Sequence, residues 1–127
     1  MTPEVENAVQ EIKDLFSDKE IEVEGLNDGG ARVIVKDIEL SSNYIPQVTW
    51  IGFIIGFQYP RADVYPHFID PTIKRVDENA LGEGFSGPVE WQSRNCIQVS
   101  RRSNKLDPSI DTAATKLAKV INWINSK

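Results

Sequence analysis

The stretch from Gln58 to Pro71, QYPRADVYPHFIDP, constrains the fold most because it contains three prolines. Two of them belong to Tyr-Pro steps, Tyr59-Pro60 and Tyr65-Pro66, that lie six residues apart. A proline has no backbone N–H to donate, and it biases the residue before it toward extended geometry. This part of the chain therefore cannot be helical. We expect a short edge strand that wraps a sheet.

The residues ahead of this stretch have the patterns of β-strands. Residues 20–24 alternate polar and apolar side chains, and residues 31–35 resume the alternation after Asn27-Asp28-Gly29-Gly30, whose residue types suit a hairpin turn. The alternation changes phase at residues 36–38, which indicates a bulge or a bend. Residues 48–57 form the most apolar run and predict a central strand covered on both faces. Together the segments predict an antiparallel meander.

Amphipathic helices bracket these strands. Thr2-Pro3-Glu4 has the residue types of a helix start, and apolar side chains then recur at helical spacing to near Ser17. After a predicted loop over residues 77–88, a second start is expected at Asp107-Pro108. The apolar stripe that follows it comprises Ile110, Ala113, Ala114, Leu117, Val120, Ile121 and Ile124. The order of elements predicts one α+β domain over residues 1–127.

The composition is typical of a globular protein and bears on where in the cell it is found. With 127 residues, 40% of them hydrophobic and 26% charged, the chain can build a core without disulfides or metal. Its single cysteine cannot form an internal disulfide, which fits a reducing compartment. No apolar run approaches the roughly 20 residues that span a bilayer, and the first residues lack the order of a signal peptide. We expect a cytoplasmic protein without a membrane partner.

The charge is negative overall but unevenly distributed. A formal net charge of −5 argues against nonspecific binding of nucleic acid, which needs a basic surface. Residues 4–28 contain nine acidic and two basic side chains, whereas residues 94–105 contain four basic and no acidic ones. The basic run predicts either a solvated face or a positive rim around Cys96 that meets an acidic or carboxylate-bearing partner.

Cys96 is the candidate for covalent chemistry. It lies in the segment Trp91–Arg102, WQSRNCIQVSRR, which has three arginines and no acidic side chain. Nearby positive charge and partial exposure favour a reactive thiolate, whereas a lone cysteine can equally be a small buried residue of the core. A hydrolase dyad would need His67, the only histidine, to lie beside Cys96. These residues do not have the spacing of metal ligands, and we expect no metal and no other cofactor.

The order of elements and the Tyr-Pro stretch resemble the ubiquitin-conjugating fold. Phe57-Gln58-Tyr59-Pro60 through Tyr65-Pro66-His67-Phe68 is similar to the family's Tyr-Pro-x-x-x-Pro stretch after the third strand, and Cys96 lies 30 residues beyond Pro66. The resemblance implies an N-terminal helix, an antiparallel meander of about four strands, a catalytic loop and a C-terminal helix. The chain most resembles compact bacterial conjugating-enzyme-like proteins, which accompany a ubiquitin-like modifier, an activating enzyme and a deubiquitinase-like peptidase in systems linked to phage defence.

The resemblance also implies a mechanism and its residues. Cys96 would accept the modifier from the activating enzyme as a thioester and pass it to an amine of a protein substrate. Asn95 would stabilise the oxyanion. Arg94 and Arg101 would favour the thiolate or hold the modifier's tail, and Ser100 would orient the amine.

Two other interpretations stay open on the residues alone. The His-Pro-Asn motif that eukaryotic members have upstream of the cysteine is missing, and Pro88 lies near where its asparagine would fall. This departure fits a catalytically silent interaction module on the same fold. The third interpretation is an unrelated α+β domain that binds a small molecule or a protein.

Overall fold

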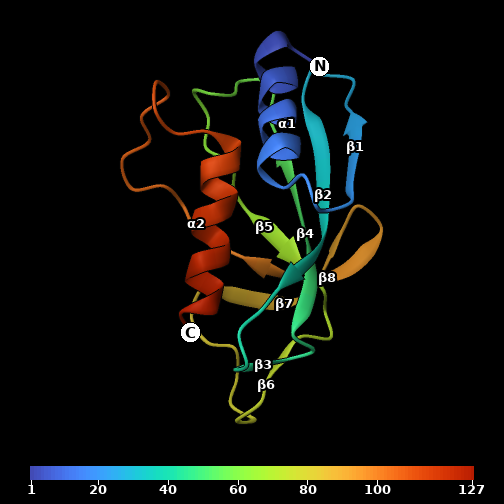
Figure 1. Ribbon diagram of the computed structural model, residues 1–127, viewed down its shortest axis with the longest axis vertical. Coiled ribbons are helices and arrows are strands. Elements are labelled where there is room, and N and C mark those ends of the chain that lie inside the picture. Colours follow the sequence, from blue (N-terminus) through green and yellow to red (C-terminus); the bar gives the residue numbers. More distant parts are fainter.

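Two helices pack side by side on one face of an antiparallel sheet in the computed structural model, which describes all residues from Met1 to Lys127 (Figure 1). This confirms the predicted α+β class and the order of helix, antiparallel strands and helix. The elements are α1 (Pro3–Leu15), β1 (Ile21–Gly25), β2 (Ala31–Glu39), β3 (Tyr44–Ile45), β4 (Val48–Ile55), β5 (His67–Ile69), β6 (Lys74–Arg75), β7 (Phe85–Trp91), β8 (Arg94–Val99) and α2 (Ala113–Asn125).

The main sheet has six strands in the order β1-β2-β4-β5-β8-β7, and every neighbouring pair is antiparallel. The meander predicted from residues 20–24, 31–35 and 48–57 forms the first three strands of this sheet, and β3 and β6 form a separate two-stranded sheet. The expectation of an edge strand after the Tyr-Pro steps is wrong, because β5 pairs with β4 on one side and β8 on the other. Pro66 and Pro71 lie just outside β5, so the backbone donors of the strand itself remain available to both neighbours.

Local backbone features follow the sequence closely in the first half of the chain. Gly29 has φ +99° in the predicted hairpin turn, and the Asp28 carboxylate accepts a hydrogen bond of 2.9 Å from the Gly30 N–H. The register between β2 and β4 shifts between Val35 and Ile38, where the phase of the apolar pattern changes. The bulge is therefore confirmed.

The segment around Cys96 differs from the prediction. β7 begins at Phe85, inside the expected loop of residues 77–88, and it forms a hairpin with β8. Gln92 and Ser93 make the turn of this hairpin with positive φ angles. Cys96 consequently lies within a strand and not in a loop. The polar residue types of this segment hid the alternation of β8, in which successive side chains point to opposite faces.

The second helix begins five residues later than expected. Thr112 is the N-cap, because its hydroxyl accepts from the Thr115 N–H while the Thr115 hydroxyl accepts from the Thr112 N–H. Asp107 instead forms a turn in which its carboxylate accepts from the Ser109 backbone and hydroxyl. Ile110 therefore lies outside the helix, and 70% of its surface is exposed.

The core lies mainly between the helices and the sheet. Residues Val5, Val9 and Ile12 of α1 and the apolar stripe of α2 pack on side chains from β2, β4, β5 and β8. A smaller cluster on the opposite face consists of Ile34, Phe68, Trp91 and Cys96. Neither helix is both long and apolar enough to cross a membrane.

Candidate functional site

Cys96 lies in β8 and is fully buried, with 0% of its surface exposed. It packs in a cluster with one side chain from each of three other strands: Ile34 of β2, Phe68 of β5 and Trp91 of β7. Its Sγ lies 3.5 Å from the Val89 carbonyl oxygen across the hairpin, close enough to donate a weak hydrogen bond. In this conformation the sulfur is closed to a thioester from another molecule.

The indole of Trp91 covers this cluster. It stacks on the Phe68 ring with centroids 4.6 Å apart and an interplanar angle of 12°. It also lies against Gly52 of β4, where an added Cβ would be 2.5 Å from an indole carbon. Glycine at position 52 therefore lets Trp91 lie close to the sheet. Both helices lie on the other face of the sheet (Figure 1). On this face, Cys96 is covered by aromatic side chains and not by a helix.

The environment of the thiol disfavours its ionised form. Burial raises the pKa of Cys96, and the nearby charge of Arg94 and a hydrogen bond from the Trp91 backbone oppose this without cancelling it. A thiolate is the nucleophilic form of cysteine. The buried thiol is therefore protonated and unreactive at neutral pH.

Arg94 is the one predicted supporting residue whose side chain shares the face of Cys96. Its position two residues before Cys96 in β8 places both on the same face. The guanidinium lies over the Trp50 ring, 5.2 Å from its centroid. Asn95 is exposed and, as the intervening residue, points to the opposite face, away from the sulfur.

Ser100 and Arg101 lie beyond the end of β8. The Ser100 N–H donates to the Gly84 carbonyl, and its hydroxyl accepts from the Gln98 side chain at 3.1 Å. The Arg101 guanidinium lies over the Trp123 ring of α2, 4.8 Å from its centroid. The structure thus places Arg94 on the same face as Cys96 but does not gather Asn95, Ser100 and Arg101 around the sulfur. The basic run therefore does not form a positive rim around Cys96, because Arg101 lies beside α2.

His67 lies on the other face of the sheet from Cys96. It packs on Phe53 in the main core, with ring centroids 5.0 Å apart, and both ring nitrogens are buried without a hydrogen-bond partner. Burial lowers the pKa of His67 to about 3, helped by the charge of Lys116 and opposed by that of Asp63. A Cys96–His67 dyad is therefore excluded in this fold. No three His, Cys, Asp or Glu side chains form a group that could hold a metal ion.

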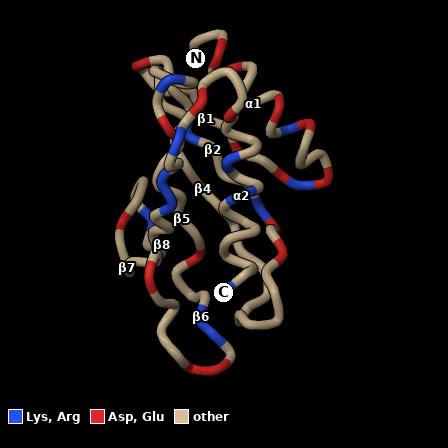
Figure 2. The backbone as a smooth tube through the Cα atoms, turned by 90° about the vertical axis from the view of Figure 1, so that its left-hand side faces the viewer, with Lys and Arg blue, Asp and Glu red and all other residues tan.

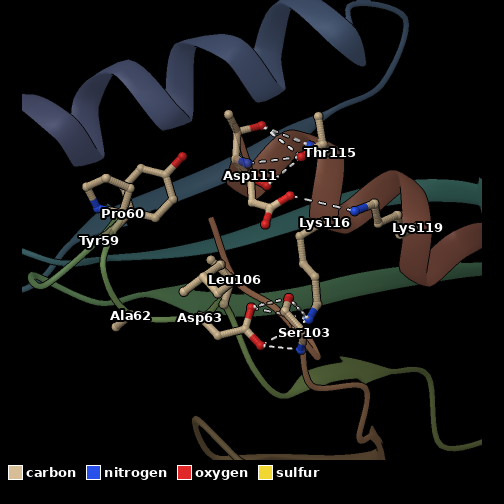
Figure 3. A pocket seen from close by; sticks show the side chains of 12 residues that line it. Tyr59, Pro60, Ala62, Asp63, Ser103, Leu106, Asp111, Thr115, Lys116 and Lys119 are labelled. Atoms are coloured by element: carbon tan, nitrogen blue, oxygen red, sulfur yellow. Dashed lines mark hydrogen bonds and ion pairs between the residues drawn. The ribbon is translucent and has the colours of Figure 1, made fainter. Parts of the chain in front are cut away.

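A polar cluster on the helix-covered side joins the Tyr-Pro stretch to α2 and to the loop ahead of α2 (Figure 3). Lys116 extends from α2, and its Nζ lies 3.2 Å from each carboxylate oxygen of Asp63 in the Tyr-Pro stretch. Ser103 completes the cluster by donating to Asp63 through its backbone at 2.7 Å and its hydroxyl at 2.9 Å. The Lys116 Nζ also donates to the Ser103 hydroxyl oxygen at 2.9 Å. The cluster fastens the loop ahead of α2 to the Tyr-Pro stretch.

The electrostatics and the volume of this cluster indicate a structural clamp. Burial by itself would raise the pKa of Asp63, but the hydrogen bonds from Ser103 and the ammonium of Lys116 together hold it below the usual value. The hollow lined by these residues and Tyr59 has a volume of only about 10 Å³, roughly one water molecule. It is too small to accept a substrate.

Sequence reasoning missed this cluster, although one signal was present. Lys116 lies on the apolar stripe of α2, between Ala113 and Val120, at a position where a core side chain is expected. A lysine on such a stripe is buried only when a partner neutralises its charge. The identity of the partner could not be read, because Asp63 is 53 residues away.

The geometry is that of an α+β domain with an antiparallel meander between terminal helices, the layout of ubiquitin-conjugating-like proteins. A family model described as prokaryotic E2 family E matches residues 10–127, nearly the whole chain. The chain belongs to this family, which gives it a ubiquitin-conjugating-like role and, in general, a modifier and an activating enzyme as partners. Neither the curated proteins nor the solved structures give a significant match.

Proposed function

We propose that this chain acts in a ubiquitin-like conjugation system as a module that binds its protein partners without covalent attachment. Membership of the prokaryotic E2 family supports a place in a conjugation system. The burial of Cys96 under Trp91 supports a role without covalent attachment. A thiol with 0% exposure and a raised pKa is a core side chain in its folded environment. The link of such systems to phage defence is part of this proposal.

A thioester carrier is the second candidate, because Cys96 is the only cysteine and no helix covers its face of the sheet. The Cys96 thiol would lose its proton and attack the thioester carbonyl, and the activating enzyme's thiolate would leave. A substrate amine would then displace the Cys96 thiolate and form an amide. Withdrawing the Trp91 indole from its buried position would expose apolar surface to water, so the reactive form would be a minor population.

A charging assay separates the two candidates. The protein is mixed with ATP and with the activating enzyme and the modifier encoded beside its gene, and gels are run with and without reductant. We expect the activating enzyme to charge itself while no adduct reaches this chain. A modifier-sized adduct that reductant removes, and that Cys96→Ala lacks, would establish the carrier and reject the non-covalent proposal.

A binding measurement provides the positive arm of the test. Calorimetric titration of the activating enzyme, and separately of the modifier, into wild-type protein and Cys96→Ala is expected to give equal affinities for at least one partner. Circular dichroism controls for folding of the variant. Absence of binding by both partners to wild-type protein would contradict the proposed module.

A further inference from the structure

The basic run that follows β8 borders a hollow against α2. The hollow has a volume of about 330 Å³, which falls in the lower range of ligand-binding pockets. Five cationic side chains and one carboxylate contribute to its walls: Arg101, Arg102, Lys105, Lys116, Lys119 and Asp111. Basic residues of α2 appear as blue segments in Figure 2. The hollow is cationic in a protein whose formal net charge is −5.

Three of these cations are free to meet an anion. Lys116 is paired with Asp63, at 3.2 Å, and Lys119 with Asp111, at 3.7 Å. The remaining three, Arg101, Arg102 and Lys105, form no ion pair in the structure. Their charges are therefore not neutralised by the protein itself.

Aromatic rings hold the two arginines in position. The Arg101 guanidinium lies over Trp123, 4.8 Å from the ring centroid, and the Arg102 guanidinium lies over Tyr65 at 4.5 Å. Trp123 is itself packed against Phe85 of β7, with centroids 5.0 Å apart. The N–H groups that a guanidinium does not use in contacts with its neighbours can bind a carboxylate in a two-pronged geometry. Two arginines that contact aromatic rings thus border the hollow, and their charge suits carboxylates.

We propose that this hollow binds an acidic segment, rich in Asp and Glu, of a protein partner. Its three free cations can engage more than one carboxylate, which a segment of peptide supplies. A nucleic acid is disfavoured because a long polyanion would also meet the strongly acidic first quarter of the chain, which has nine acidic and two basic side chains over residues 4–28. The inference goes beyond the proposed function, because it places the contact and gives the chemistry of the partner.

Hexaglutamate tests the inference on the protein alone, with hexaglutamine as the uncharged control peptide. Calorimetry gives the affinity, and the indole N–H resonance of Trp123 in a ¹⁵N-labelled sample reports on the hollow. We expect saturable binding of hexaglutamate, a shift of the Trp123 resonance and no binding of hexaglutamine. Raising the salt concentration should weaken the binding, since exposed charges are screened.

Variants locate the binding. Arg101→Gln combined with Arg102→Gln is expected to weaken hexaglutamate binding about tenfold or more. The matched control, Lys13→Gln combined with Lys74→Gln, removes two positive charges from exposed residues outside the hollow and should leave the affinity unchanged. Arg101→Lys with Arg102→Lys keeps the charge but loses the two-pronged geometry, and an intermediate affinity is expected.

Three results would overturn the inference: no binding of hexaglutamate, equal losses in both pairs of Gln variants, or tighter binding of a single-stranded oligonucleotide than of hexaglutamate. These results are independent of the partners in the conjugation system. If hexaglutamate binds as expected while the activating enzyme and the modifier do not bind at all, the hollow is supported and the proposed function fails.

Discussion

The two faces of the sheet differ in the exposure of their reactive and charged side chains. On the face without helices, Cys96 is enclosed by Phe68 and Trp91, and its thiol is kept protonated. On the face with the helices, Lys116 reaches the edge of the core to pair with Asp63, and Arg101 and Arg102 border an open hollow nearby. The single cysteine is thus protected from solvent, while the surface suited to partners lies beside α2.

Removing the Trp91 indole tests the enclosure of Cys96 and has the largest expected effect. Trp91→Ala should lower the free energy of unfolding by about 3–5 kcal/mol, because it deletes a buried aromatic side chain. It should also raise the rate at which a thiol reagent labels Cys96 in the native protein at least about tenfold. Urea denaturation and labelling kinetics measure the two effects.

Trp123→Ala provides the control for this experiment. This variant removes a side chain of the same type from α2, at the cationic hollow, and should leave the labelling rate of Cys96 unchanged. Wild-type protein that labels as fast as a free thiol would contradict the enclosure of Cys96. If Trp91→Ala does not fold, Trp91→Phe tests the same cover with a smaller loss of stability.

The pH dependence of stability tests the helix-covered face. His67 has a pKa of about 3 in the folded protein and about 6.5 when unfolded, so the unfolded chain binds its proton first as the pH falls. The stabilising contribution is therefore complete above about pH 6.5 and declines toward pH 3. At pH 5 the loss should be about 2 kcal/mol relative to pH 8.

His67→Phe isolates this contribution from the carboxylates that titrate in the same range. The variant keeps an aromatic ring against Phe53 and removes the titrating group. Urea denaturation at pH 8, 7, 6 and 5 should give a smaller decline for the variant than for the wild type. Parallel curves would show that His67 accepts a proton without unfolding and that its burial is incomplete.

The Asp63–Lys116 pair is expected to contribute less, because it lies at the edge of the core. The two side chains are 21% and 10% exposed, so removing either charge should destabilise the protein by about 1–2 kcal/mol. A double-mutant cycle with Asp63→Asn and Lys116→Met measures the coupling between them. The same cycle on the exposed pair Glu20 and Lys36 should give less than about 0.5 kcal/mol. Equal couplings would contradict the role of the buried pair as a clamp.

Sequence patterns predicted the parts of the fold that local rules govern. The apolar stripes predicted which faces of the two helices lie in the core. The Asn-Asp-Gly-Gly turn predicted the hairpin between β1 and β2, and the phase change at residues 36–38 predicted the bulge. Pairing between distant segments was not readable. Nothing near β5 revealed that β8 would pair with its second edge, and that pairing is what buries Cys96. Strand alternation also separates Cys96 from Asn95 although they are adjacent in the sequence, so their position along the chain did not reveal that they lie on opposite faces.

The smallest expected effect concerns the start of α2, the helix that carries Lys116 and the wall of the hollow. Thr112→Ala should lower the free energy of unfolding by about 1 kcal/mol, because it removes the side chain that caps the Thr115 N–H. Asp107→Ala, at the start predicted from sequence, should change it by less than about 0.5 kcal/mol, since Asp107 stabilises only an exposed turn. The reverse order of the two effects would place the helix start at Asp107. That result would bring Ile110 into the helix and alter the wall of the hollow that contains Asp111, so measuring both variants in urea also tests the geometry on which the cationic hollow depends.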